Sequence, residues 1–384
     1  MHLTKEEEDI LAGQDGPGPA KAMELLIALG KIYDADKLIP IESAQIAGVS
    51  YKTMGDAGLK FIEDFSEIAS VSVRAMLNPA GMDLGKKGIE SEDFRQKQLR
   101  LIDAYKRIGI EVSCTCTPYL AGNRPEKNSH IAWSESSAVS FANSVLGART
   151  NREGGPSALM AAVIGKTPYY GLHIKENRAP SIVLQVNEKV PMPLLGYYSG
   201  EILSDDIPYF KGINPDKDDL KSLGAAMAAT GSVAMYHVED ITPEYNDFSI
   251  DNLEIVEIGI EEIEEVKNRL ITEKTPDVIV LGCPHLSSRE INRVANHLKD
   301  RKPKDGPELR IYTSKYVKEA NEDAVKIIEK FGEVITDTCM VVSPLEEKYS
   351  TAATNSGKAA AYLPKLADQK VLYADLETLL EMII

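Results

Sequence analysis

The stretch VIVLGCPHLSSREINRVANHL, residues 278–298, carries the pattern that decides the fold. Residues 278–281 form a short apolar run typical of a buried strand, and apolar residues over 287–298 recur at helical spacing. The same alternation continues on both sides. Further strands are predicted near Ile255, over 309–312 and over 333–335, and further helices over 261–270 and 317–331. The resulting β-α-β-α-β series predicts a parallel sheet with right-handed crossovers, and hence an α/β fold.

Two cysteines directly follow strands of this series. Cys283 lies two residues after the strand 278–281, and Cys339 follows the strand 333–335 in the sequence TDTC. Ligands of open parallel sheets bind outside the carboxyl ends of the strands, so we expect both thiols at one functional edge. The alternative is that they are inert buried thiols, although a packing thiol is more natural within a strand or on a helix face.

A third cysteine is expected from the run 111–117, which is rich in β-forming residues. Cys114 and Cys116 stand two positions apart on this extended run, so both side chains are predicted on one face, and Pro118 imposes a turn or extended backbone after them. Spacing leaves both as candidate ligands. We prefer Cys116, which lies beside the turn, and interpret Cys114 as neighbouring core.

The cysteine pattern favours iron and sulfur over zinc. It is not a CxxC motif, whereas soft thiolates suit an iron–sulfur cluster or another thiophilic metal. Three thiolates on a four-iron cluster leave one iron without a protein ligand. That iron can bind the hydroxyl and the carboxylate of a substrate as a Lewis acid, which is the chemistry of a hydro-lyase.

Composition and charge restrict the partners. The chain has 384 residues with 43% hydrophobic content, enough for two or three domains, and 59 acidic against 43 basic residues give a net charge of -16. This charge argues against nucleic acid but permits a small anionic substrate held by a few local cations and amides. No leader-like N-terminus or long apolar run stands out, so we expect no membrane association and a cytoplasmic location.

The N-terminal half reads as mostly helical before the run 111–117. Thr4 and Glu7 form a capping-box pattern, and helices are predicted over 20–32, 52–65 and 92–108. The Gly/Pro/Asp-rich segment 204–219 is the best linker candidate. It places a boundary between two α/β regions, 1–205 and 206–384.

Three turns that precede helices offer backbone amides to an anion. They are RTNREGGPS (149–157), NSGK (355–358) and SAQIAGVSY (43–51). The first joins two arginines, Arg149 and Arg152, to Gly-Gly-Pro before an Ala-rich helix. The alternative is ordinary helix starts, with Ser50 as an N-cap. Ala352 replaces the first glycine of a P-loop, so ATP binding is not predicted.

A carboxylate lies among hydroxyls soon after the Cys116 segment. It is Glu135, in the sequence WSESS over 133–137. Glu135 is a candidate general acid or substrate ligand, with an unpaired surface glutamate as the alternative interpretation.

Six segments together resemble the aconitase X family across nearly the whole chain. They are SAQIAGVSY (43–51), SCTCTPYLAGN (113–123), WSESSAVSFANSVLGARTNREGGPSAL (133–159), VLGCPH (280–285), DTCMVV (337–342) and TNSGKAAAYLP (354–364). The resemblance implies an aconitase-like multidomain α/β fold with parallel sheets flanked by helices. A subdivision of the two regions into three aconitase-like domains is compatible with it.

The resemblance also implies an activity and a cofactor. The implied hydro-lyase converts (R)-5-phosphomevalonate to trans-anhydromevalonate 5-phosphate in a modified mevalonate route to isoprenoids. Dehydration of cis-3-hydroxy-L-proline is the alternative activity. The implied cofactor is a 4Fe-4S cluster on Cys116, Cys283 and Cys339, which purified material could also hold as 3Fe-4S or in depleted form.

The implied substrate contacts come from four short segments. They are Gly48, Val49, Ser50, Asn78, Pro79, Glu135, Ser136 and Lys358. To these we add Arg152 from the anion-binding turn.

In the resembled family, a swivelling β-rich part carries the catalytic serine. We expect that part on a separate small subunit, so this chain would be inactive alone and no catalytic residue is assigned in it apart from the candidate Glu135. A non-catalytic iron–sulfur or metal-binding protein is the alternative of another class.

Overall fold

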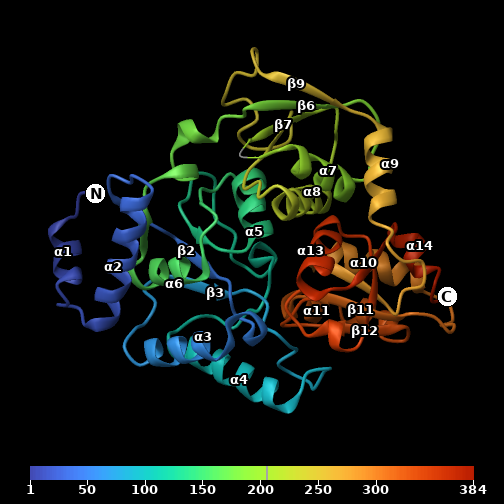
Figure 1. Ribbon diagram of the computed structural model, residues 1–384, viewed down its shortest axis with the longest axis horizontal. Coiled ribbons are helices and arrows are strands. Elements are labelled where there is room, and N and C mark those ends of the chain that lie inside the picture. The colour runs from blue at the N-terminus through green and yellow to red at the C-terminus, as the bar shows by residue number, and fades with distance from the viewer. Residues whose placement is uncertain (205) are drawn as a thin grey trace.

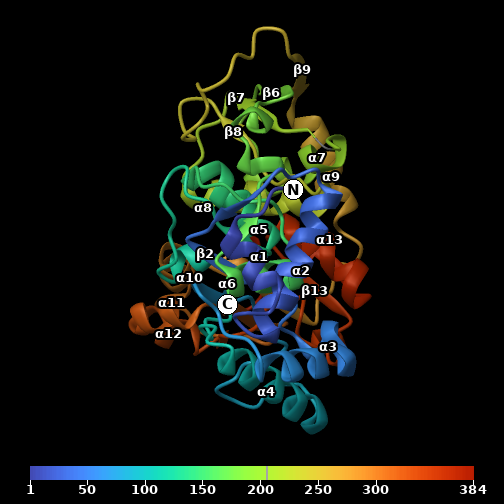
Figure 2. The same ribbon diagram turned by 90° about the vertical axis from the view of Figure 1, so that its left-hand side faces the viewer.

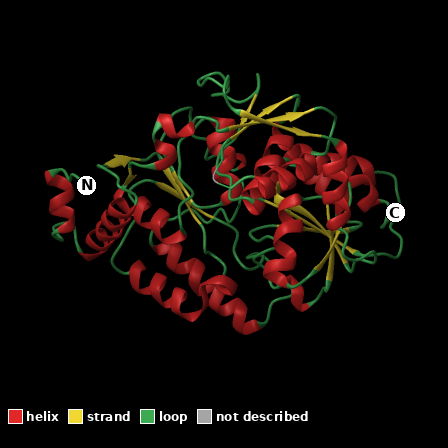
Figure 3. Cartoon of the chain, turned by 45° about the horizontal axis from the view of Figure 1, so that its top comes forward, coloured by secondary structure: helices red, strands yellow, loops and turns green. Residues whose placement is uncertain are grey.

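The computed structural model describes residues 1–204 and 206–384 and shows parallel sheets covered by helices (Figures 1 and 3). The α/β prediction is therefore confirmed. The predicted boundary between residues 205 and 206 touches residue 205, which lies outside the described residues. Within the described chain, no helix has the length and apolar character needed to span a membrane.

The C-terminal sheet contains the stretch that decided the fold. Its five strands pair in parallel in the order β12-β11-β10-β13-β14. They are β10 (Val278–Leu286), β11 (Glu308–Thr313), β12 (Gly332–Ile335), β13 (Thr351–Thr354) and β14 (Lys370–Tyr373). Its helices are α10 (Ser288–Leu298), α11 (Lys315–Ala320), α12 (Glu322–Ile328), α13 (Gly357–Ala367) and α14 (Leu376–Leu380). The single helix predicted over 317–331 is in fact two, because Asn321 between them has a non-helical φ of -133°.

The middle sheet has four parallel strands in the order β8-β7-β6-β9. The strands are β6 (Ile182–Val186), β7 (Pro208–Lys211), β8 (His237–Val238) and β9 (Glu254–Ile258), and the helices are α7 (Met192–Ile202), α8 (Lys217–Thr230) and α9 (Ile260–Arg269). The strand predicted near Ile255 is β9, which pairs with β6 rather than with the C-terminal sheet. The linker predicted over 204–219 is wrong, because it contains β7, where Tyr209 and Phe210 are buried, and the start of α8.

The N-terminal part is built on a three-stranded parallel sheet in the order β3-β2-β4, with a separate antiparallel pair β1-β5. The strands are β1 (Leu38–Pro40), β2 (Ser43–Ile46), β3 (Arg74–Leu77), β4 (Ala132–Trp133) and β5 (Lys166–Pro168). The helices are α1 (Lys5–Leu11), α2 (Pro17–Ile32), α3 (Tyr51–Ser66), α4 (Glu92–Arg107), α5 (Ser136–Phe141) and α6 (Gly155–Ile164). The Thr4–Glu7 capping box is confirmed.

Short helical turns complete the chain. They are η1 (Pro118–Leu120), η2 (Ala142–Leu146), η3 (Gly171–His173), η4 (Lys175–Arg178) and η5 (Leu345–Glu347). The run 111–117 does not form the predicted strand. Glu111 makes one isolated bridge to Met76, and Cys114 has a left-handed φ of 43° that breaks the extended backbone.

The three parts pack around a common centre. Figure 1 shows the N-terminal elements on the left, the C-terminal sheet on the right and the middle sheet above them, and Figure 2 shows the middle sheet at the same end of the molecule after a quarter turn. Helices α5 and α8 contact each other, and so do α8 and α13. The centre is thus formed by one helix from each part.

A buried arginine links the N-terminal and middle parts. Arg178 is fully buried and donates two hydrogen bonds to the Glu244 carboxylate, at 2.9 and 2.7 Å. Its Nη2 also donates to the backbone carbonyls of Asn143 and Ala148, both at 3.1 Å, and its Nη1 donates to the Asn143 side-chain oxygen at 3.2 Å and to the Leu172 carbonyl at 3.1 Å. A charge buried this deeply requires a partner, so Arg178 and Glu244 depend on each other.

Replacing this arginine should destabilise the fold far more than replacing an exposed one. We expect Arg178→Met to lower the free energy of unfolding by about 3–5 kcal/mol in urea titrations followed by circular dichroism, because Glu244 is left charged and unpaired. The matched control is Arg269→Met, whose exposed pair with Glu201 should contribute about 1 kcal/mol or less. Equal effects of the two variants would contradict this interpretation.

Candidate active site

Cys116 and Cys339 lie outside strands, whereas the prediction that Cys283 follows its strand is wrong, because β10 continues to Leu286 across an irregularity in its pairing. Cys283 lies within β10, after the point where the pairing of β10 with β11 becomes irregular. Gly282 makes this possible: its φ is +101°, and a Cβ added there would lie 2.1 Å from the Tyr312 carbonyl oxygen. Cys339 follows β12, and Cys116 precedes the turn η1. Irregular backbone therefore presents each thiol.

The structure brings Cys116, Cys283 and Cys339 into one environment. Burial raises the pKa of all three thiols, that of Cys283 to about 12, and the charges of Glu135 and Lys358 act on each of them. Cys339 in turn acts on both other thiols. Three segments that are distant in sequence therefore place sulfur around one ion pair.

Cys114 occupies a different environment. It is fully buried in the N-terminal core, where burial raises the pKa of its thiol, and its charged neighbours are Asp337 and Lys315. The left-handed backbone at Cys114 is the physical reason that it does not share a face with Cys116, as an extended run would require. The prediction of a shared face is wrong, and Cys116 is the one that lies near the other two thiols.

A buried ion pair stands at the centre of this environment. Lys358 at the start of α13 donates to Glu135, the residue before α5, and also to the Ser137 hydroxyl at 3.2 Å. Asn78 donates from Nδ2 to the other Glu135 oxygen at 2.7 Å. Burial alone would raise the pKa of Glu135, but Lys358, Asn78 and Arg152 together lower it to about 2. Glu135 is therefore a carboxylate at neutral pH and cannot donate a proton in this state.

Asn78 has spare hydrogen-bonding capacity beside this pair. Its Oδ1 is buried and has no hydrogen-bond partner among the described residues. Such an acceptor matches a ligand hydroxyl, since an unpaired buried polar atom is costly. Arg152 is exposed and acts on Glu135 through its charge, so it lies toward the solvent side of the pair.

The Gly48–Ser50 turn supports the Cys339 segment. Ser50 stands at the N-cap of α3, yet its hydroxyl donates to the Val342 carbonyl at 2.8 Å instead of capping the helix. The Val49 carbonyl accepts from Gln98 at 2.8 Å, and Gly48 has a φ of +76°. The Ser50 bond holds the turn against the loop that carries Cys339, and the Gln98 bond holds it against α4.

Two other predicted contacts are weaker. Pro79 is buried beside Asn78, and the Ser136 hydroxyl lies 3.4 Å from Glu135, which is long for a hydrogen bond. Direct hydrogen bonds within the predicted set therefore join Asn78, Glu135 and Lys358.

The donor set fits an iron–sulfur cluster better than a single ion. Among the described residues, no three His, Cys, Asp or Glu side chains are grouped tightly enough for one metal ion. The three thiols instead share the charged neighbours Glu135 and Lys358, and the backbone N–H of His285 donates to Cys116 Sγ at 3.2 Å. Hydrogen bonds of this kind tune the sulfurs of clusters.

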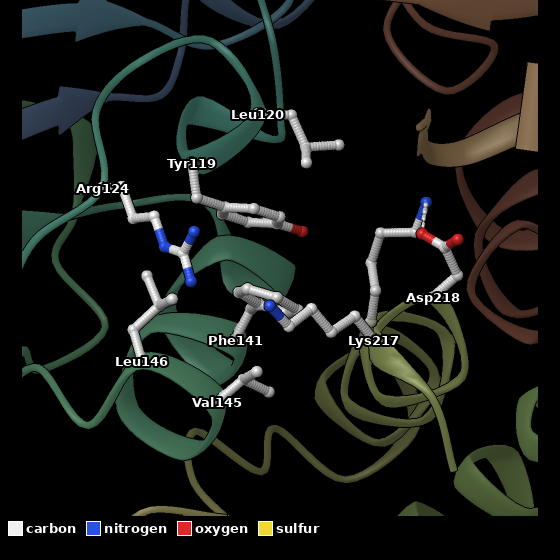
Figure 4. A pocket seen from close by; sticks show the side chains of 9 residues that line it. Tyr119, Leu120, Arg124, Phe141, Val145, Leu146, Lys217 and Asp218 are labelled. Carbon is white, nitrogen blue, oxygen red and sulfur yellow. Dashed lines mark ion pairs between the residues drawn. The ribbon is translucent and has the colours of Figure 1, made fainter. Parts of the chain in front are cut away.

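A separate small pocket adjoins the segment after Cys116 (Figure 4). It has a cavity volume of about 100 Å³, and the rings of Tyr119 and Phe141 stack in its wall with centroids 3.9 Å apart. Buried Lys221 also lines it and donates to the His285 carbonyl at 3.2 Å. None of the predicted substrate contacts lines this pocket. Its wall contacts the Cys283 segment through Lys221, which bonds the backbone of His285.

Sequence reasoning did not single out three residues that join the site. They are Ser137, Thr115 and His285. The available signal for His285 was its position two residues after Cys283, in the stretch that decided the fold. Ser137 and Thr115 gave no comparable signal, because hydroxyl residues are common at helix starts and in turns.

Fold and site together define a multidomain α/β protein whose thiols, carboxylate and lysine converge at the ends of parallel strands. Three family models, described as the first, second and third domains of aconitase X, match residues 1–176, 180–268 and 276–384. The chain belongs to the aconitase X family.

Several relatives match nearly the whole chain. The phosphomevalonate dehydratase large subunit of Methanocaldococcus jannaschii is 51% identical, over 99% of this chain and 100% of that protein. The crystal structure of the holo form of aconitase X from Thermococcus kodakaraensis superposes with a TM-score of 0.95 at 48% identity, covering 100% of both chains. The cis-3-hydroxy-L-proline dehydratase of Hypocrea jecorina is more distant, at 32% identity over 98% of this chain and 67% of that protein.

The Glu135 carboxylate should contribute stability in a defined pH range. Its pKa in the folded chain, about 2, lies below the ordinary value of 4.5, so its contribution is complete above about pH 4.5 and is lost as the pH falls toward 2. At pH 7, Glu135→Gln should lower the free energy of unfolding by about 3–5 kcal/mol, because Lys358 loses its partner. The difference from wild type should shrink as the pH falls through that range.

Denaturant titrations at several pH values measure this difference. The control is Glu67→Gln, an exposed carboxylate paired with Arg107, which should change stability by about 1 kcal/mol or less at every pH. A difference between wild type and Glu135→Gln that stays constant from pH 7 to pH 2 would refute the assignment.

Proposed function

We propose that this chain is the large subunit of a hydro-lyase that dehydrates phosphomevalonate. The observation that carries the proposal is the convergence of three thiols, contributed by three separate segments, around the Glu135–Lys358 pair. The relatives that match nearly the whole chain at high identity have the same activity in their names. As the large subunit, the chain implies a small-subunit partner.

The cofactor of the proposed enzyme is a 4Fe-4S cluster on Cys116, Cys283 and Cys339. When bound, such a cluster supplies an iron without a protein ligand, which acts as a Lewis acid on the departing hydroxyl. The chain itself contributes burial, which excludes water, and the His285 N–H directed at the Cys116 thiol. The residues fit a cluster, and we propose the 4Fe-4S type, with the 3Fe-4S and depleted forms as products of iron loss.

The polar residues of the site have distinct proposed roles. Lys358 offers positive charge for a substrate carboxylate at the buried end, and the Asn78 Oδ1 accepts from a substrate hydroxyl. Glu135 keeps the Lys358 ammonium in place. The turn of Gly48, Val49 and Ser50, with Pro79 and Ser136, shapes the wall. We propose no proton-transfer role for Glu135, because it is ionised and has no proton to donate, and because its low pKa of about 2 makes it a weak base.

The proton alpha to the carboxylate then needs a base from outside this chain. We propose that the small subunit supplies it, as a serine on a swivelling domain, and that the dehydration product is trans-anhydromevalonate 5-phosphate. In this assignment the large subunit alone binds substrate without turnover, and the catalyst is a heterodimer of a modified mevalonate pathway.

A phosphorylated substrate is favoured over hydroxyproline by the turn at Arg152. Helix α6 begins at Gly155 with Gly154 as N-cap, so its first amides and the exposed Arg152 lie on the same turn near Glu135. Free amides at a helix N-terminus together with an arginine suit a phosphate group, which cis-3-hydroxy-L-proline lacks. The relative named for that second substrate is also the more distant one.

Cysteine variants test the proposal. Anaerobically prepared complexes with the small subunit should dehydrate phosphomevalonate, and Cys116→Ser, Cys283→Ser and Cys339→Ser should each abolish turnover and reduce bound iron, because each removes one ligand. Cys114→Ser is the matched control, because Cys114 is a buried thiol outside the site. This variant should keep both its turnover and its bound iron.

Three results would contradict parts of the proposal. Turnover of cis-3-hydroxy-L-proline alone would refute the substrate. Full activity of Cys283→Ser would refute the ligand set. Iron binding without turnover of either substrate would favour a non-catalytic iron–sulfur protein.

Arg152 should affect substrate affinity more than turnover. Loss of one charge-assisted hydrogen bond to the phosphate should raise KM for phosphomevalonate about 10- to 100-fold in Arg152→Met, with kcat less affected. The control is Arg301→Met, an exposed arginine in the loop after α10. Steady-state kinetics measure both constants, and an unchanged KM in Arg152→Met would remove this residue from the site.

A further inference from the structure

We propose that His285 is a positioning residue, which holds the segments of Cys116 and Cys339 in register with Cys283. The inference rests on the proposed cluster site. It concerns a residue whose own side chain is not a proposed ligand and which belongs to the same strand as Cys283, two residues further on.

The imidazole of His285 bridges the two other cysteine segments. Its Nδ1 lies 3.0 Å from the Thr115 hydroxyl, next to Cys116 in the chain, and its Nε2 lies 2.9 Å from the carbonyl of Thr338, next to Cys339. The ring is fully buried. One rigid side chain therefore connects neighbours of two thiols, while its backbone fixes the distance to the third.

The backbone of His285 adds two more contacts. Its N–H donates to Cys116 Sγ at 3.2 Å, and its carbonyl accepts from Lys221 of α8 at 3.2 Å. All four polar atoms of the residue are therefore used, each on a different partner. These four contacts constrain both the residue type and its place in the chain.

The partners fix the direction of the hydrogen bonds. A carbonyl can only accept, so Nε2 carries the proton and donates to Thr338, which leaves Nδ1 to accept from Thr115. The Thr115 oxygen in turn accepts from the Thr117 N–H at 3.1 Å, and the Thr115 carbonyl accepts from Gln45 of β2 at 3.0 Å. The Cys116 segment is thus held from both sides.

In the described chain, neither segment belongs to a strand, and each is paired with the sheet region only through an isolated bridge, Glu111 with Met76 and Thr338 with Ala80. The run 111–117 forms no strand, and the loop after β12 reaches Cys339 through Asp337, whose φ is 65°. Outer hydrogen-bond partners of metal ligands commonly matter about 10- to 100-fold for affinity. His285 is hydrogen-bonded to the segments of both Cys116 and Cys339.

Two substitutions separate the hydrogen bonds made by the two ring nitrogens of His285. His285→Asn keeps an acceptor near the Nδ1 position and loses the bond to Thr338, whereas His285→Gln keeps a donor near the Nε2 position and loses the bond to Thr115. In the metal-free complex, alkylation rates resolved by mass spectrometry should rise about tenfold at Cys339 in the first variant and at Cys116 in the second. After anaerobic reconstitution, both should bind iron about 10- to 100-fold more weakly, with a shifted EPR spectrum of the oxidised cluster.

The control is another buried histidine. His237 is 1% exposed and its Nε2 bonds the Arg178 carbonyl at 2.9 Å, so His237→Gln should alter thermal stability but leave alkylation and the EPR spectrum unchanged. If the His285 variants do not fold, Thr115→Val tests the hydrogen bond to the His285 Nδ1. Thr115→Ser, which keeps the hydroxyl, is the conservative rescue. Thr115→Val should raise Cys116 alkylation and Thr115→Ser should restore it.

The outcomes separate this inference from the proposed function. Wild-type alkylation and EPR spectra in both His285 variants, or changes no larger than those of His237→Gln, would overturn the positioning role. A cluster that persists in Cys283→Ser would instead overturn the proposed ligand set, while the alkylation rates of the metal-free chain would still report on His285.

Discussion

A buried ion pair between Glu135 and Lys358 joins the first part of the chain to the last. Neither charge is stable in a buried site by itself, so the pair forms only when the two parts are docked. The thiols of Cys116, Cys283 and Cys339 all lie within the field of this pair. Docking of the parts and formation of the site are therefore the same event, and Arg178 fixes the middle part in a similar way.

Local apolar periodicity was sufficient to predict the fold class. The strands between residues 278 and 335 were predicted nearly as observed, because burial on both faces of a parallel strand leaves a short continuous apolar run. Strands β13 and β14, which complete the same sheet, were not predicted. The pairing of β9 with β6 was not predictable, since it depends on partners distant in sequence. Strand β7 was missed because Pro208 and Gly212 bracket a run too short to show any period.

The site residues near strand ends were predictable from the sequence, whereas the contacts that form on docking were not. The strand-end rule placed Cys283 and Cys339 at one edge, but the distinction between Cys114 and Cys116 depends on a left-handed residue that no pattern of side chains reveals. Contacts across the site follow from docking: Glu135 and Lys358 are 223 residues apart, and Thr115 and His285 are 170 residues apart. Such pairs are visible only when the parts are assembled.

The scattered origin of the thiols also sets an order of events during synthesis. Cys116 leaves the ribosome long before Cys283 and Cys339, and Lys358 follows after all three. A nascent chain that has not reached residue 339 therefore carries an incomplete set of the proposed ligands. The proposed cluster would therefore be loaded onto a folded chain in which all three segments are already docked, and a chain truncated before residue 339 would lack one of its proposed ligands.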